Sequence, residues 1–348
     1  MSTGIVLLNF GEPSTPDRDV VVEYLTRIFL ANADLESADD PTERARELAE
    51  RRAPGLIEEY EAIDGSPLNQ QASEQATALQ STLDARGYDV IVYSSYQFIE
   101  PLIESTVTDI EADGVDRVIG LPVYPLCGPS TTVAALDRLT DAIDSIADWS
   151  PDVNAITGWH RHPTYNHLRA DVIRSHVAET GLDITSDAVQ LVFSAHGTPL
   201  SYVESGSRYV EYVEEYCRVI SAMVGVDDYA LGYQNHENRD IPWTEPTIET
   251  VVDDLQDTAH IVVDAISFMH EQSETLSELD IDLRDDAVRN GVEYHRVPIP
   301  YDDPRFTTML ADLVEPFVLE FDSKYYRFGR CTCRDRPDSF CLNSTAPR

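Results

Sequence analysis

Short runs of apolar and β-branched residues alternate along this chain with longer stretches in which apolar residues recur at helical spacing. This alternation is typical of parallel β-sheets covered by helices. The runs predict strands in two groups, at residues 5–9, 89–94, 117–121 and 154–158, and at 189–194, 229–233, 260–265 and 294–299. Within each group the later strands follow one another after about 30–40 residues, the length of one βαβ unit. The pattern therefore predicts an α/β protein with two similar Rossmann-like domains, each a four-stranded parallel sheet flanked by helices.

The widest gap between predicted strands, at about residues 19–64, predicts two helices that could form a lip over a cleft. No linker rich in glycine and serine is present, so we expect the domains to share an interface. The predicted division is an N-terminal domain at 1–165 with the lip, a C-terminal domain at 166–322 with a last helix at about 304–321, and a Cys-rich extension at 323–348.

Acidic residues dominate the charge of the chain, with 63 Asp and Glu against 25 Lys and Arg and a net charge of −38. This excess argues against binding to nucleic acid or anionic lipid, because both need a basic surface. The 42% of hydrophobic residues argues against disorder. Lys324 is the single lysine, a composition suited to molar salt, where the Debye length falls to about 3 Å. No apolar run reaches the ~20 residues of a membrane span, and we see no signal peptide, so we expect a cytoplasmic protein of a halophile.

Candidate catalytic side chains follow two of the predicted strands, at the carboxyl ends where α/β proteins bind ligands. His196 lies on a turn fixed by Gly197 and Pro199, where an imidazole could hold a metal or accept a proton. Glu271 and Glu274 stand three residues apart at a predicted helix start, so they share a face near the positive end of the helix dipole. A structural histidine and a capping pair of glutamates are the alternatives. Motifs for phosphate binding, serine hydrolysis and zinc proteolysis are absent, which leaves proton and metal chemistry.

Ordered segments over nearly the whole chain resemble the ferrochelatases, the enzymes that insert ferrous iron into a porphyrin. The resemblance is most specific at 193–199, which reads Phe-Ser-Ala-His-Gly-Thr-Pro, and at 268–280. The further similar segments are 7–13, 51–54, 64–68, 124–132, 159–165 and 233–243.

The resemblance implies that His196 and Glu274 face each other across the macrocycle as catalytic, Fe²⁺-binding residues, with Glu271 assisting. Two pyrrole N–H protons must leave as Fe²⁺ enters, so the site needs a base inside an apolar slot. The resemblance also implies substrate-binding wall residues at Phe10, Tyr60, Ser66, Tyr124, Gln234 and Trp243.

The chain departs from the family pattern at several positions. Many members have an Asp-His pair where this chain has Glu271-Gln272, and its His270 is displaced by two positions. Phe10 stands where some relatives carry an iron-coordinating tyrosine, and phenylalanine cannot ligate iron. The arginines that relatives using coproporphyrin offer to its propionates are not evident.

Five cysteines are present, and three of them crowd the C-terminus. In a reducing compartment, metal ligation or free thiols outrank disulfides. Some ferrochelatases hold a 2Fe–2S cluster with three ligands from a C-terminal extension and one from inside the fold. By that resemblance the ligands are Cys127, Cys331, Cys333 and Cys341, while Cys217 is spare. A zinc site and free thiols are the alternatives.

We therefore expect a lyase of haem biosynthesis that takes Fe²⁺ and either protoporphyrin IX or coproporphyrin III as substrates. A chelatase that inserts cobalt or nickel into a cyclic tetrapyrrole is one alternative, because His and Glu ligands do not select the metal. A non-catalytic porphyrin or haem carrier is the other. The oligomeric state is left open.

Overall fold

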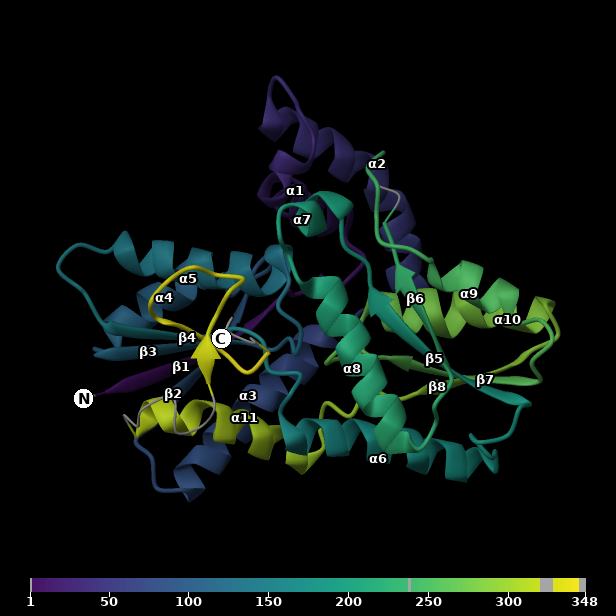
Figure 1. Cartoon of the computed structure of the whole chain (residues 1–348). Coiled ribbons are helices and arrows are strands. Elements are labelled where there is room, and N and C mark those ends of the chain that lie inside the picture. The colour runs from purple at the N-terminus through teal and green to yellow at the C-terminus, as the bar shows by residue number, and fades with distance from the viewer. Residues whose placement is uncertain (1, 237–238, 320–327, 344–348) are drawn as a thin grey trace.

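A computed structural model describes residues 2–236, 239–319 and 328–343, which form two β-sheets lying side by side (Figure 1). The strand order is β2-β1-β3-β4-β10-β9 in the first sheet and β6-β5-β7-β8 in the second. The first sheet contains β1 (Thr3–Asn9), β2 (Val90–Tyr96), β3 (Arg117–Pro122), β4 (Asp152–Ile156), β9 (Gly329–Arg330) and β10 (Ser339–Cys341). The second contains β5 (Val189–His196), β6 (Tyr229–Gln234), β7 (His260–Ala265) and β8 (Glu293–Val297).

All the strands predicted from the hydrophobic pattern are present, and the pairings among them are parallel. The prediction of four strands per sheet is correct for the second sheet and wrong for the first, which has six strands among the described residues. The additional strands come from the Cys-rich extension, where β10 pairs with β4 and β9 pairs antiparallel with β10. Strands of two and three residues are too short to show alternation, so the pattern does not reveal them.

Helices flank both sheets, and Figure 1 shows α1 and α2 projecting together from the region between them. Asp17 and Asp40 begin these two helices, because each carboxylate accepts hydrogen bonds from backbone N–H groups of the first turn. The α-helices are α1 (Arg18–Ala31), α2 (Pro41–Ala62), α3 (Leu68–Ala85), α4 (Ile103–Ala112), α5 (Ala134–Asp144), α6 (Pro163–Thr180), α7 (Leu200–Glu204), α8 (Tyr209–Val224), α9 (Ile248–Asp254), α10 (Arg284–Arg289) and α11 (Pro304–Val318). Three further helical segments are η1 (Ala33–Leu35), η2 (Pro129–Val133) and η3 (Glu274–Leu283).

The long helix α11 connects the two domains along one side of the molecule. α11 packs against α3 beside the first sheet and against α6 beside the second, as Figure 1 shows. The last two residues of the predicted helix at 304–321 lie outside the described residues. In the described part of the chain, no helix is long and apolar enough to cross a membrane.

A buried ion pair fixes α6 to the second sheet. Arg169 on α6 donates to the Asp264 carboxylate of β7 over 2.7 Å, and both side chains are almost fully buried. Arg169 also donates to the carbonyl oxygens of Ala265, at 2.8 Å, and of Phe268. One guanidinium therefore holds the end of β7 and the loop that leaves it.

Candidate active site

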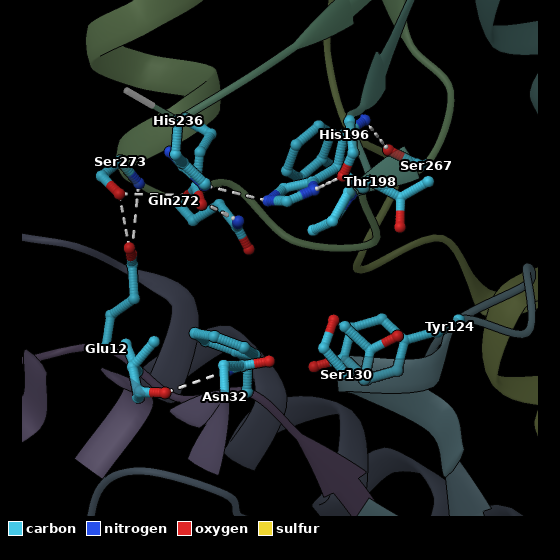
Figure 2. A pocket seen from close by; sticks show the side chains of 18 of the residues that line it. Glu12, Asn32, Tyr124, Ser130, His196, Thr198, His236, Ser267, Gln272 and Ser273 are labelled. Atoms are coloured by element: carbon cyan, nitrogen blue, oxygen red, sulfur yellow. Dashed lines mark hydrogen bonds between the residues drawn. The ribbon is translucent and has the colours of Figure 1, made fainter. Parts of the chain in front are cut away.

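A deep pocket opens between the carboxyl ends of the two sheets, lined by residues that follow β1, β3, β5, β6 and β7 and by side chains of α1 and α2. Its empty space is about 1680 Å³ when the open solvent at its mouth is included. Figure 2 shows His196 and His236 on one side of the pocket and Tyr124 and Ser130 on the other. The pocket therefore lies where open α/β sheets bind ligands, at the carboxyl ends of the strands.

His196 ends the central strand β5 and reaches into this pocket. Its Nδ1 lies 2.6 Å from the carbonyl oxygen of Gly197. Since a carbonyl can only accept, Nδ1 carries the proton and Nε2 keeps a free lone pair in the neutral ring. The backbone is fixed as well, because the His196 N–H donates to Ser267 Oγ over 2.9 Å and the Tyr209 hydroxyl donates to the His196 carbonyl.

The turn after His196 requires glycine. A Cβ at position 197 would collide with the side chain of Asn235 and would lie 2.9 Å from the carbonyl oxygen of Gln234. Gly197 also donates its N–H to that carbonyl over 2.7 Å. The close approach of the loops after β5 and β6 therefore sets the direction of the His196 ring.

His236, in the loop after β6, supplies a second imidazole that the sequence prediction missed. Its Nε2 lies 3.1 Å from Nε2 of His196. Burial first, and then the neighbouring His196, lower the pKa of His236 to about 4, so the ring is neutral at physiological pH. A ligating atom from each of His196, His236 and Glu274 lies within 4.8 Å of the other two. Two imidazoles and a carboxylate form a donor set that suits divalent iron.

Glu274 opens η3, a wide π-helical segment of the kind that often marks functional sites. Its Oε2 accepts hydrogen bonds from Gln272 Nε2 over 2.7 Å and from Ser273 Oγ over 3.1 Å. Gln272, the departure from the family pattern, thus holds the glutamate by donating to it.

Two further carboxylates, those of Glu12 and Glu278, lie near Glu274. Burial first, and then the charge of Glu274, raise the pKa of Glu12 to about 7 and that of Glu278 to about 8. Glu12 accepts hydrogen bonds from Ser66 Oγ and from Ser273 Oγ and N–H, and Figure 2 shows it directed at Ser273. The Ser273 hydroxyl therefore bridges Glu12 and Glu274, and the three acids cannot all be ionised easily near neutral pH.

The structure places most of the predicted wall residues on the pocket surface. Phe10, Tyr60, Tyr124 and Trp243 line it. Ser66 and Gln234 lie behind the lining: Ser66 donates to Glu12, and Gln234 donates to Glu278 over 2.8 Å. These two residues hold carboxylates rather than forming the wall.

Glu271, predicted to assist catalysis, lies away from the pocket lining. It precedes η3 instead of sharing a helical face with Glu274. Its carboxylate accepts from Arg296 over 2.9 Å, from the Ile299 N–H over 3.1 Å and from Thr275 Oγ1 over 2.7 Å. Glu271 thus ties the segment before η3 to the end of β8, and the buried acids beside Glu274 are Glu12 and Glu278.

The structure also gathers the cysteines of the C-terminal extension around an internal one. The sulfur atoms of Cys127, Cys331 and Cys333 all lie within 4.8 Å of one another. Hydrogen bonds from Cys127, Cys333 and then Cys341 lower the pKa of Cys331. Cys217 is buried in the core between α8 and the second sheet.

The hairpin that carries these cysteines is anchored by Arg334, whose side chain is nearly fully buried. Its guanidinium donates to Asp137 Oδ1 over 2.8 Å and to Thr140 Oγ1 over 2.7 Å, both on α5, and to Ser339 Oγ over 2.6 Å. The extension is therefore a packed part of the first domain.

Two facing α/β domains with two imidazoles and a carboxylate grouped in their cleft, a set able to hold a metal ion, are the features of a metal-inserting chelatase. The fold agrees with that of a solved chelatase, "SirB from Bacillus subtilis with Fe3+", which matches at a TM-score of 0.50 and 10% identity, over 92% of this chain and 99% of that chain. At this identity the comparison concerns the fold alone.

The ferrochelatase family model matches residues 2–317. A curated ferrochelatase of Synechococcus sp. strain JA-2-3B'a(2-13) is 36% identical over 329 residues, which cover 91% of this chain and 93% of that protein. A ferrochelatase of Synechococcus sp. strain JA-3-3Ab is also 36% identical, over 91% of this chain and 94% of its own length. The chain belongs to the ferrochelatase family and is therefore a lyase that inserts ferrous iron into a porphyrin in haem biosynthesis, as the sequence segments predicted.

Proposed function

We propose that Fe²⁺ is delivered to the porphyrin by His196, His236 and Glu274. The main support for this proposal is that one ligating atom from each of these three residues lies within 4.8 Å of the other two at the pocket surface. The contact of His196 Nδ1 with the Gly197 carbonyl oxygen leaves Nε2 as the nitrogen available for a metal, and burial keeps His236 uncharged. The nearby carboxyl groups of Glu12 and Glu278, with pKa values of about 7 and 8, gain negative charge that attracts the cation as the pH rises through these values.

Glu12 and Glu278 can also accept the two pyrrole N–H protons that must leave the porphyrin. Each pyrrole N–H releases its proton while its electron pair stays on nitrogen and binds the incoming Fe²⁺. Acceptors work best when their pKa lies near the working pH, and the pKa values of Glu12, about 7, and Glu278, about 8, meet that condition. The Ser273 hydroxyl between Glu274 and Glu12 offers a path for a proton away from the macrocycle.

We propose protoporphyrin IX as the preferred macrocycle. Coproporphyrin III carries four propionates and protoporphyrin IX two, so the former needs more cationic partners. Among the described residues of the lining, the arginines are Arg52 and Arg239. Arg52 pairs with Glu59 over 2.6 Å, and Arg239 donates to the carbonyl oxygens of Phe29, at 2.8 Å, and Asn32. The apolar walls with few uncommitted charges suit the macrocycle that has fewer propionates.

An anaerobic insertion assay in molar KCl tests this function. Fe²⁺ is supplied with each porphyrin in turn, and the loss of porphyrin fluorescence is followed. We expect faster turnover with protoporphyrin IX, and no turnover by His196→Ala or Glu274→Gln while circular dichroism stays unchanged. His167→Ala, at an exposed position on α6, is the matched control and should turn over normally.

His236→Gln separates delivery of the metal from the chemistry. Removing one imidazole should raise KM for Fe²⁺ more than it lowers kcat, since the acids that accept protons remain. Normal turnover by the His196 and Glu274 variants would refute the assignment. Tight porphyrin binding without insertion by the wild type would favour a carrier, and preference for Co²⁺ or Ni²⁺ would favour the other chelatase.

We propose further that Cys127, Cys331, Cys333 and Cys341 hold a 2Fe–2S cluster. Four thiolates are the usual ligand set of such a cluster. Three of these thiols, those of Cys127, Cys331 and Cys333, lie within 4.8 Å of one another, and the thiol of Cys341 is a hydrogen-bond partner of Cys331. Hydrogen bonding from its neighbours favours the thiolate of Cys331, the form that binds metal. When bound, the cluster would supply a redox-active cross-link between the extension and the first domain.

Protein purified without air should show the visible absorption of an iron–sulfur cluster, with two Fe and two S²⁻ per chain. Cys331→Ser should lose both, whereas Cys217→Ser, the cysteine outside the group, should keep both. Zinc in place of iron would support the zinc alternative, and a colourless, metal-free protein would support free thiols.

We also propose that the enzyme works in a cytoplasm of high salt concentration. The net charge of −38 produces strong self-repulsion that molar salt screens. Turnover and the unfolding midpoint should both rise between 0.1 M and 2 M KCl, and a maximum at low salt would contradict the proposal.

A further inference from the structure

A second cluster of metal-ligating side chains lies at the amino ends of β7 and β8, away from the pocket. His260 is the first residue of β7 and is paired in register with Glu293, the first residue of β8. His295 follows two residues later on the same face. The pocket residues follow the opposite end of β7, about 17 Å along the strand at roughly 3.3 Å per residue.

The three side chains bring their ligating atoms together. Nδ1 of His260 lies 3.2 Å from Oε2 of Glu293 and 3.3 Å from Nε2 of His295, and the latter two atoms are 4.0 Å apart. Two ligands of a tetrahedral zinc-type ion, each bonded at about 2.0–2.1 Å, stand about 3.3 Å apart. Two of the three separations already match this value, and the third needs only a small rotation of Glu293.

Hydrogen bonding alone leaves this cluster poorly satisfied. A neutral His260 has at most one proton on Nδ1, which cannot be donated to both Glu293 and His295. A divalent cation would accept the lone pairs of all three atoms at once.

The surroundings of the cluster are open to ions. Glu293 is 71% exposed, His260 26% and His295 19%, so an ion can enter from solvent.

We propose that His260, Glu293 and His295 form a second metal site, which takes one divalent first-row ion that prefers imidazole, such as Zn²⁺, and is separate from the iron-insertion site. Water completes the coordination. The bound ion would join the amino ends of β7 and β8 and stabilise the second sheet by mass action. This site does not depend on the function proposed for the pocket.

Equilibrium dialysis of the full chain against Zn²⁺, followed by metal analysis, tests the proposal. We expect His260→Ala and His295→Ala each to bind one equivalent fewer than the wild type, while His167→Ala binds as the wild type does. The same loss should appear in the His196→Ala and Cys331→Ser backgrounds, which separates this site from the pocket and the thiol group.

Glu293→Gln is a variant that should fold as the wild type does, because the Glu293 side chain is largely exposed. It should weaken Zn²⁺ binding and reduce the rise in Tm that Zn²⁺ produces in the wild type. All these variants should keep wild-type insertion turnover. Unchanged zinc stoichiometry in His260→Ala and His295→Ala would overturn the proposal.

Discussion

The buried carboxylate of Glu12 should make the stability of the protein fall as the pH rises. Its side chain is 3% exposed, and its pKa is raised from 4.5 to about 7, chiefly by burial. A raised pKa means that the folded state holds this proton more tightly than the unfolded state does. The stability that Glu12 contributes is therefore fully present below pH 4.5 and is lost as the pH rises through about 7. At about 1.4 kcal/mol per pKa unit, the full loss is about 3 kcal/mol.

Glu12→Gln removes this titration, so the free energies of unfolding of the wild type and the variant should diverge with pH. We expect the variant to gain about 3 kcal/mol relative to the wild type between pH 4.5 and pH 8.5. Urea unfolding at several pH values in constant molar KCl measures this difference, and Glu58→Gln, at an exposed position of α2, is the control. Parallel pH curves for the wild type and Glu12→Gln would refute the reasoning that burial sets the charge state of Glu12.

Two further substitutions test other parts of the structure. Arg169→Met leaves Asp264 buried without its partner and should lower the free energy of unfolding by about 3–5 kcal/mol. Arg174→Met, at an exposed position on the same helix, is its control in urea unfolding, and an equal effect of both would contradict the role of the buried pair. Gly197→Ala should shift the His196 ring and reduce kcat by about 100-fold without unfolding the protein. Near-normal kcat in the insertion assay would show that this turn tolerates a Cβ.

The sequence predicts the strands and the two central residues of the site because both depend on local signals. A run of apolar residues marks each strand, and His196 and Glu274 follow strand ends where ligands bind. Glu271 also follows a strand end, but Arg296, a residue of the next strand, directs its side chain away from the pocket. His236 approaches His196 only because a loop folds back across neighbouring strands. Such side-chain directions depend on contacts between distant segments, which a periodic pattern does not record.

The position of β10 has a consequence for the solution behaviour of the protein. β10 pairs with β4, so the extension covers a strand that would otherwise end the first sheet. An uncovered edge strand presents unpaired N–H and C=O groups that invite pairing with another chain. The short hairpin that carries Cys331, Cys333 and Cys341 therefore covers this edge, and loss of the hairpin would expose the backbone N–H and C=O groups of β4 that now pair with β10.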